Sequence, residues 1–116
     1  MRILILEDDP LIALDLQAIV EAEGHEVVGV FDNLADAGDH LGEGCDFALL
    51  DIDVPDGKSF GLAASLLERR IPFVFVSGSR PSELPHHLRG ASFIAKPYEE
   101  AAIRRSIASG LRSAQH

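Results

Sequence analysis

The chain has 116 residues, 47% of them apolar and 25% charged, so we expect residues 1–116 to form one globular domain without an output domain. Its formal net charge of −9 and its ten scattered lysines and arginines argue against binding to nucleic-acid phosphates. The apolar runs are too short to span a membrane, no signal peptide precedes the first strand, and the single cysteine, Cys45, fits a reducing compartment. We therefore expect a cytoplasmic protein that does not bind membranes.

Strands and helices are predicted to alternate along the whole chain. The expected strands are 2–6, 26–33, 46–52, 72–78 and 92–95, and the expected helices are 10–24, 34–44, 59–70 and 98–113. The first helix should be capped by Asp9 at its start, and Gly24 suits its C-terminal cap.

The expected strands are apolar on both faces, which is typical of a parallel sheet buried between two layers of helices. Five strand-helix units predict an α/β, flavodoxin-like, doubly wound sheet with the strand order 2-1-3-4-5. The segment between the last two strands departs from this pattern, because Pro85 would interrupt a helix begun at Pro81. We therefore expect the fourth helix, within 79–90, to be short or irregular.

Chemically reactive side chains stand where four of the strands end. Glu7 and Asp8 follow the first strand, Asp51 ends the third, and the fourth and fifth end at Ser77 and Lys96. These four strands are neighbours in the order 2-1-3-4-5, and ligands of such sheets bind beyond the carboxyl ends of the strands. The acids, the hydroxyl and the amine should therefore line one cleft.

Carboxylates crowded into one cleft repel each other, by about 4 kcal/mol for a pair at about 4 Å. Oxygen ligands without thiolates or clustered histidines suit Mg²⁺. A divalent ion, a lysine and a hydroxyl together would neutralise a phosphoryl group. One carboxylate can act as the nucleophile and form an aspartyl phosphate, and Asp51, which should face the centre of the cleft, is our candidate.

Four motifs in this order give the chain its resemblance to a known family. "ILEDD", "LLDIDVPDG", "VFVSG" and "AKP" follow four strands, and nearly the whole chain resembles a response-regulator receiver domain of two-component signalling. It is also similar to stand-alone receivers of alphaproteobacteria. The resemblance implies that Asp51 is the phosphoacceptor, that Asp8 binds Mg²⁺ directly and that Glu7 binds it through water.

The resemblance assigns further roles beside that pair of acids. It implies that the backbone carbonyl of Asp53 is a third metal ligand, that Ser77 hydrogen-bonds the phosphoryl oxygen and that Lys96 pairs with it. Phe93 matches the position of a switching aromatic, and the Lys96–Pro97 bond is often cis in the family. Plainer roles remain open, with Asp53 as a turn residue and Phe93 as an ordinary strand aromatic.

As a receiver, the chain would be a signalling protein that assists its own phosphorylation and dephosphorylation, and not an enzyme. Its phosphodonor would be a phosphohistidine on a sensor histidine kinase or a histidine phosphotransfer protein. It would then bind an unknown downstream protein or serve as a phosphate relay or sink. Receivers transmit the signal through their fourth helix, fifth strand and fifth helix. An irregular fourth helix therefore argues against the usual output route, but not against phosphorylation.

Two other functions compete with the receiver. A haloacid-dehalogenase-like phosphatase uses an Asp-x-Asp pair, a hydroxyl residue and a lysine, which Asp51, Asp53, Ser77 and Lys96 imitate. In those enzymes, however, the pair lies on the first strand, and this chain has no cap insertion. The other alternative is a pseudo-receiver that binds partners without phosphorylation, against which the complete set of site residues argues.

Overall fold

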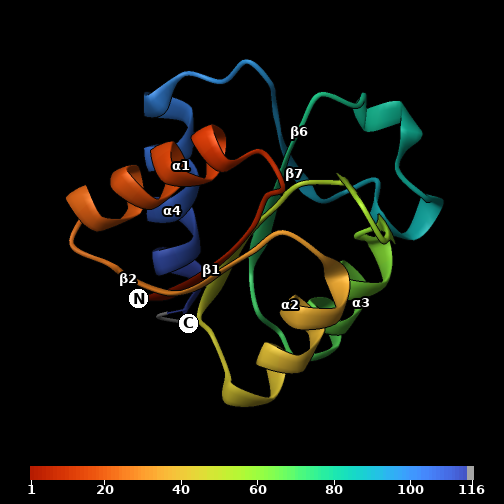
Figure 1. Ribbon diagram of the computed structural model, residues 1–116, viewed down its shortest axis with the longest axis horizontal. Helices are drawn as coiled ribbons and strands as arrows, with labels where there is room; N and C mark the ends of the chain where they lie inside the picture. Colours follow the sequence, from red (N-terminus) through yellow and green to blue (C-terminus); the bar gives the residue numbers. More distant parts are fainter. Residues whose placement is uncertain (115–116) are drawn as a thin grey trace.

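A five-stranded parallel sheet forms the centre of the computed structural model, which describes residues 1–114 (Figure 1). Its strands are β1 (Arg2–Leu6), β2 (Glu26–Phe31), β3 (Phe47–Leu50), β6 (Phe73–Ser77) and β7 (Ser92–Ala95). They lie in the order β2-β1-β3-β6-β7, and every neighbouring pair is parallel. This order is the predicted 2-1-3-4-5 of a flavodoxin-like sheet.

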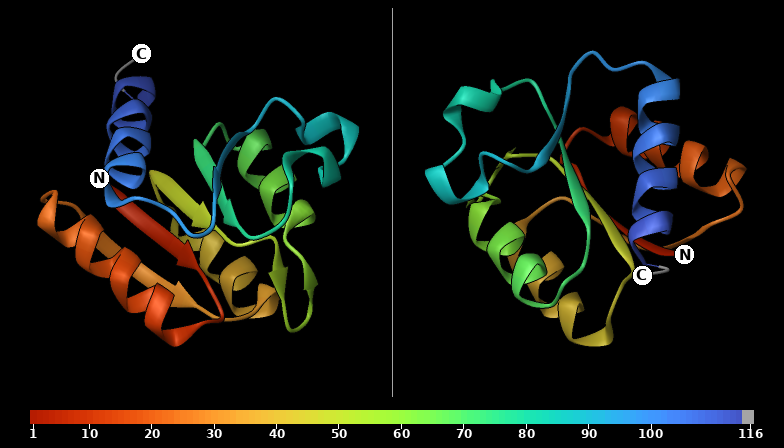
Figure 2. Two further views of the ribbon diagram at one scale, coloured as in Figure 1. Left: turned by 90° about the horizontal axis from the view of Figure 1, so that it is seen from above. Right: turned by 180° about the vertical axis from the view of Figure 1, so that it is seen from behind.

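Helices cover both faces of the sheet, as predicted. They are α1 (Pro10–Ala22), α2 (Leu34–His40), α3 (Phe60–Glu68) and α4 (Glu100–Ala114), and a short 3₁₀ turn, η1 (Leu41–Glu43), follows α2. Helices α1 and α4 lie on one face, and α2 and α3 lie on the other (Figures 1 and 2). The predicted ends of the elements differ from the observed ones by a few residues.

Alternate residues of each strand feed two separate apolar clusters, which explains why the strands are apolar throughout. In β1, Leu4 and Leu6 join the cluster under α2 and α3, while Ile3 and Ile5 join the cluster under α1 and α4. All four side chains are buried. Burial of a side chain of this size stabilises the fold by about 1.5–3 kcal/mol. Because alternate residues of one strand contact opposite layers, the same strands hold both helical layers in place.

Local signals in the sequence account for the ends of α1. The side chain of Asp9 accepts hydrogen bonds from the backbone amides of Leu11 and Ile12, as an N-cap does. Gly24 follows the helix with a φ of +83°, a left-handed conformation that favours glycine. Both capping residues were predicted.

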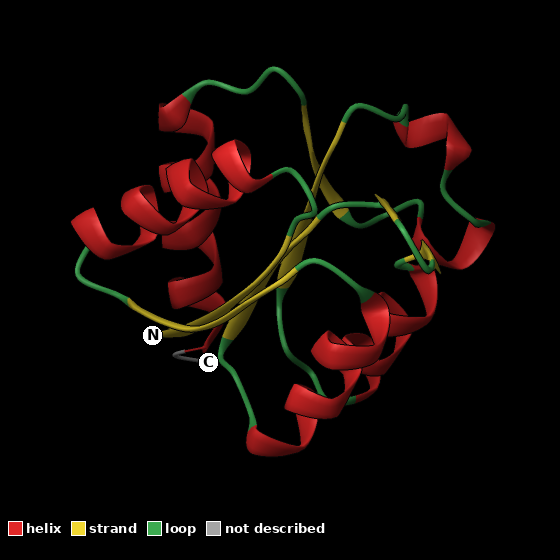
Figure 3. Cartoon of the chain, viewed as in Figure 1, coloured by secondary structure: helices red, strands yellow, loops and turns green. Residues whose placement is uncertain are grey.

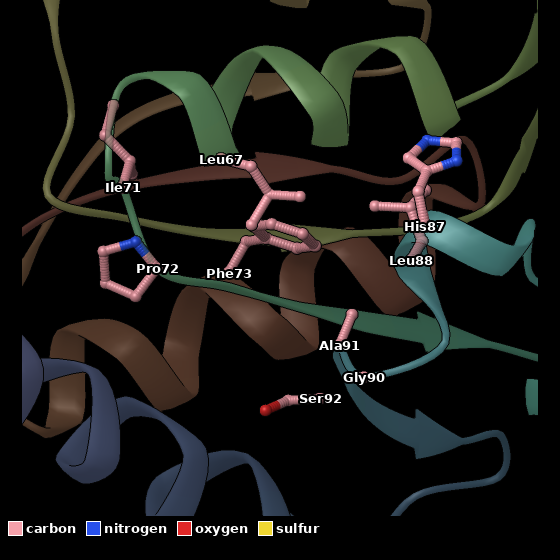
Figure 4. A pocket seen from close by; sticks show the side chains of 9 residues that line it. All are labelled: Leu67, Ile71, Pro72, Phe73, His87, Leu88, Gly90, Ala91 and Ser92. Atoms are coloured by element: carbon pink, nitrogen blue, oxygen red, sulfur yellow. The ribbon is translucent and has the colours of Figure 1, made fainter.

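The segment between β6 and β7 contains no α-helix, which confirms the prediction of a short or irregular fourth helix. It forms two 3₁₀ turns, η2 (Pro81–Glu83) and η3 (His86–Leu88), drawn as short helices in Figure 3. Leu84 and Leu88 anchor the turns in the core, at 2% and 1% exposure. An open cavity of about 290 Å³ lies between η3, α3 and the start of β6, with apolar walls that include Leu67 and Phe73 (Figure 4).

A small hairpin that the sequence did not predict follows β3. Its strands, β4 (Asp53–Val54) and β5 (Gly57–Lys58), pair in antiparallel fashion around the turn Pro55-Asp56. Gly57 has a φ of +136°, which side chains rarely allow, so the glycine permits this turn. The hairpin stands beside the carboxyl end of β3 and therefore beside the predicted site.

Candidate functional site

The predicted site residues gather at the carboxyl edge of the sheet. Backbone hydrogen bonds continue the strand pairing there, from the Glu7 amide to Phe31, from the Asp51 amide to Leu6 and from the Lys96 amide to Ser77. These bonds fix the relative heights of the side chains that follow β1, β3 and β7. The strand order thus brings together residues that are up to 89 positions apart in the sequence (96 − 7 = 89).

Three carboxylates form the centre of the site. Glu7, Asp8 and Asp51 each offer an oxygen atom, and these oxygens all lie within 4.8 Å of one another. Glu7 and Asp51 are buried, with 2% and 7% exposure, whereas Asp8 is exposed. The cluster therefore has a buried floor and one side open to solvent.

Lys96 supplies positive charge to the two buried acids. Its Nζ lies 2.5 Å from Glu7 Oε1 and 3.2 Å from Asp51 Oδ2. Burial opposes the charge of Lys96, but the contacts with Glu7 and Asp51 outweigh it and raise the lysine pKa above its usual value. Lys96 is therefore charged at neutral pH.

Burial raises the pKa of Glu7, although Lys96 and the backbone amide of Asp9 partly offset that effect. The Asp9 amide donates to Glu7 Oε2 over 3.0 Å. Within residues 1–114, Glu7 Oε1 receives no hydrogen bond of acceptable direction. Its close approach to Lys96 is therefore an ion pair and not a directed hydrogen bond.

This donor set fits Mg²⁺. All three side chains offer hard carboxylate oxygens, and the single positive charge of Lys96 does not balance three acidic groups, so the cluster can take a further cation. The exposure of Asp8 leaves room for water molecules, which Mg²⁺ usually retains. The site is thus an acidic pocket with the oxygen ligands and the access to water that Mg²⁺ requires.

Two hydrogen bonds orient Asp51. Its Oδ1 accepts from the backbone amide of Ile52 at 2.8 Å, and its backbone carbonyl accepts from Ser59 Oγ at 2.6 Å. Oδ2 is thereby left facing Lys96. Ser59, which is fully buried at the start of α3, was not predicted as a site residue from the sequence. Its position as a helix-start serine was visible, but its hydroxyl binds Asp51 instead of capping the helix.

Ser79 hydrogen-bonds to both Ser77 and Asp53, and it too was not predicted as a site residue. Ser77 is 1% exposed, and its Oγ accepts from the Ser79 amide at 3.2 Å. The Ser79 hydroxyl donates to Asp53 Oδ2 at 2.9 Å, and Lys58 pairs with the other oxygen of Asp53. The hydrogen bond from Lys58 is the main cause, and that from Ser79 the second, of an Asp53 pKa below its usual value, so this carboxylate is ionised. The metal role of the Asp53 carbonyl stays a prediction.

Phe93 lies in β7, three residues before Lys96. Its side chain is half-buried, and its ring centroid is 6.5 Å from that of Phe75. This packing fits an ordinary strand aromatic, and the switching role stays a prediction. The Lys96–Pro97 peptide bond that follows β7 is cis, as the resemblance implied.

An open cavity of about 570 Å³ adjoins the acids, between the start of α1 and the end of β2. Glu7 and Asp8 line one side, and Leu14 and Val30 are among its apolar residues. Leu14 and Val30 are 63% and 40% exposed, and Leu11 nearby in α1 is 76% exposed. The acidic cluster therefore opens beside an uncovered apolar surface.

Comparison with known proteins agrees with this geometry. Residues 3–108 match the response regulator receiver domain family. The chain is 37% identical to the phyllosphere-induced regulator PhyR of Methylorubrum extorquens, over 95% of this chain and 43% of that protein. The fold resembles the solution structure of SdrG from Sphingomonas melonis, with a TM-score of 0.83, 33% identity and 96% coverage of both chains. It also resembles the signal receiver domain of a modulated diguanylate cyclase from Desulfovibrio desulfuricans, with a TM-score of 0.84, 28% identity and coverage of 98% and 95%.

The chain therefore belongs to the response regulator receiver domain family, whose members are signalling proteins of two-component systems and not classical enzymes. The similarity to PhyR and SdrG agrees with the expected likeness to alphaproteobacterial receivers. The chain spans about half the length of the curated relatives it matches. No helix within residues 1–114 is long and apolar enough to cross a membrane.

Proposed function

We propose that this receiver accepts a phosphoryl group on Asp51 from a phosphohistidine and uses Mg²⁺ to do so. The observation that carries the proposal is the position of Asp51, which is buried between Lys96 and two further carboxylates. A structural ion pair needs one acid for one base, whereas this site gathers three acids, two of which contact the one lysine. The surplus of carboxylates is what a cation and a phosphoryl group together would require.

In the proposed reaction, an oxygen of the Asp51 side chain attacks the phosphorus of the donor phosphohistidine. The new bond joins phosphorus to the Asp51 oxygen, and the phosphorus–nitrogen bond breaks. The imidazole leaves with the bonding electrons and takes up a proton. Lys96 and the Ser77 hydroxyl would contact the oxygens of the transferred group, because their strands end beside Asp51.

Glu7, Asp8 and Asp51 are the side chains that would hold Mg²⁺. The resemblance to receivers adds the backbone carbonyl of Asp53 as a further ligand. When bound, the ion would supply positive charge that offsets the negative charge of the phosphoryl oxygens. Water attack on the aspartyl phosphate would later return the carboxylate and release phosphate. The same residues would therefore assist both phosphorylation and dephosphorylation.

The expected partners are a sensor histidine kinase or a histidine phosphotransfer protein as the donor, and a downstream protein that binds the phosphorylated form. The exposed Leu11, Leu14 and Val30 beside the acids offer an apolar surface on which a donor protein would dock. The net charge of −9 still argues against a nucleic-acid partner. The buried, unpaired Cys45 fits a cytoplasmic setting.

The decisive experiment measures the intact mass of the protein after incubation with acetyl phosphate, with and without Mg²⁺. We expect the wild type to gain one phosphoryl group only when Mg²⁺ is present, and Asp51→Asn to gain none. Asp39→Asn is the matched control, because it removes an exposed carboxylate of α2 that takes part in no hydrogen bond found in residues 1–114. It should be phosphorylated like the wild type.

Retained phosphorylation of Asp51→Asn would place the phosphoacceptor elsewhere. A folded wild type that gains no mass, with acetyl phosphate or with a phosphorylated histidine donor, would favour the pseudo-receiver. Turnover of a small phosphoester would instead favour the phosphatase.

A further inference from the structure

The hairpin of β4 and β5 is anchored at its tip on a different part of the chain. Asp56 in the turn accepts two hydrogen bonds from the first amides of α2, from Leu34 at 2.8 Å to Oδ1 and from Ala35 at 3.1 Å to Oδ2. These contacts join residues 22 and 21 positions apart. The tip also lies close to α2, where a side chain at Gly57 would contact Leu34 Cδ1.

Asp56 does not replace the normal cap of α2. Asn33 is the N-cap, and its side chain accepts from the amide of Asp36. Since Asn33 already serves the helix, the Asp56 carboxylate is a second acceptor that comes from the hairpin. The bonds from Leu34 and Ala35 also lower the pKa of Asp56, so it accepts them as an ionised carboxylate.

The base of the hairpin is attached to the phosphoacceptor strand. The Ser59 amide donates to the carbonyl of Ile52 at 2.9 Å, and the Ser59 hydroxyl donates to the carbonyl of Asp51. Between base and tip there are only two paired positions, Asp53 with Lys58 and Val54 with Gly57. A hairpin with only two paired positions has little stability of its own. The position of Asp53 therefore depends on the hydrogen bonds at the base and the tip of the hairpin.

We propose that Asp56 is a positioning residue for the metal site, which holds the hairpin on α2 and thereby keeps the backbone carbonyl of Asp53 in place to bind Mg²⁺. The inference rests on the proposed function, since it concerns the same metal ion. It adds a residue to which neither the motifs nor the resemblance gave a role, and it connects α2 to the affinity of the site for Mg²⁺.

The test measures Mg²⁺ affinity by titration calorimetry for the wild type, Asp56→Ala, Asp56→Asn and the control Asp39→Asn. Asp56→Ala removes both acceptors, and we expect it to weaken Mg²⁺ binding about tenfold, as loss of a residue that orients a metal ligand typically does. Asp56→Asn keeps one acceptor and should fall between alanine and the wild type. Asp39→Asn should bind like the wild type, although it removes the same charge from α2, the helix on which the hairpin is anchored.

Two further readouts separate positioning from a general loss of stability. With acetyl phosphate, Asp56→Ala should need more Mg²⁺ for half-maximal phosphorylation but should reach the wild-type rate at saturating Mg²⁺. Amide hydrogen exchange should accelerate at Leu34 and Ala35 in the same variant. A variant that was merely less stable would unfold at a lower temperature, but its folded molecules would bind Mg²⁺ with the wild-type affinity and would need no extra metal for phosphorylation.

The outcomes distinguish this inference from the proposed function. If the wild type binds Mg²⁺ and is phosphorylated on Asp51, but both Asp56 variants bind Mg²⁺ like Asp39→Asn, the positioning role is overturned and the receiver mechanism stands. If the wild type itself binds no Mg²⁺ and accepts no phosphoryl group, both are overturned.

Discussion

Lys96 is shared between two carboxylates, and this sharing has a chemical consequence. Its ammonium contacts Glu7 and Asp51 together. A phosphoryl group on Asp51 would bring more negative charge than the carboxylate and would compete with Glu7 for the same ammonium. We therefore expect phosphorylation to draw Lys96 away from Glu7, which would then depend on the metal ion for a counter-charge.

Asp53 should set how long the phosphorylated state lasts. Its ionised carboxylate, held by Lys58 and Ser79, would repel the phosphoryl group or orient an attacking water molecule, and both effects shorten the lifetime. We expect Asp53→Asn to slow the decay of the phosphorylated protein by about tenfold or less, below the gain of about 10²-fold that a full general base gives. The measurement is the loss of the phosphoryl mass over time after removal of acetyl phosphate.

The Asp39→Asn variant is the control for that decay, since it changes charge on α2 without touching the site. A decay rate for Asp53→Asn equal to those of the control and the wild type would leave Asp53 as a turn residue only.

The acids at the strand ends were predictable, whereas the residues that orient them were not. Glu7, Asp8 and Asp51 follow apolar runs directly, so the strand order alone places them together. Ser59 and Ser79 are hydroxyl residues in turns, where serine is common for many reasons. Their partners lie across the fold, and only the arrangement of the loops in space reveals them.

Among the elements, those with a long or strongly apolar pattern were predicted well. The first and last strands match the observed β1 and β7, and the irregular segment before β7 followed from its two prolines. The hairpin of β4 and β5 was missed because each strand has two residues, too few for an alternating pattern. Helix α2 was expected to reach residue 44, but it continues beyond His40 only as a 3₁₀ turn.

Tyr98 connects the segment before α4 to α1, and its ionisation should report on that contact. Its hydroxyl donates to Asp15 Oδ2 at 2.5 Å. The pKa of Tyr98 is raised above its usual value of about 10, mainly by burial and next by the hydrogen bond to Asp15. Since the folded protein keeps this proton where the unfolded chain loses it, the stabilisation is complete below about pH 10 and is lost as the pH rises further.

Because Tyr98 is the single tyrosine, near-ultraviolet absorbance of phenolate reports on this residue alone. We expect the wild type to form phenolate only well above pH ~10, and Asp15→Asn to shift the midpoint to lower pH. Glu21→Gln, an exposed position of the same helix, should leave the midpoint unchanged. Equal midpoints for the wild type and Asp15→Asn would show that the hydrogen bond has no influence on Tyr98.

At the scale of the whole molecule, the residues that stabilise the fold and the residues that form the site lie in different parts of the sheet. The helices form one pair on each face of the sheet (Figure 2). One apolar cluster lies between each pair and the strands. The charged groups of the site collect at the carboxyl ends of the strands, where Glu7, Asp51 and Lys96 meet. Substitutions at the exposed Asp8 should therefore change metal binding with little effect on the stability of the core.

The segment between β6 and β7, which contains only 3₁₀ turns, offers a defined site at which a protease should cut the chain into two pieces. Arg89 is exposed at the end of η3 and is followed by Gly90, whereas Arg80 precedes a proline that trypsin does not accept. We expect limited trypsin treatment to cut first after Arg89, because a short 3₁₀ turn opens more readily than an α-helix. Intact mass of the products identifies the cut, and first cleavage after Arg70 or Lys58 would contradict it.

Such a cut would leave every carboxylate of the site on residues 1–89 and Lys96 on residues 90–116. The pairing of β7 with β6 and the packing of α4 on α1 would hold the two pieces together after mild cleavage. Separated pieces should each fail to accept a phosphoryl group, and mixing them should restore acceptance. The receiver would then work as a split protein whose activity reports the reunion of its acids with its lysine.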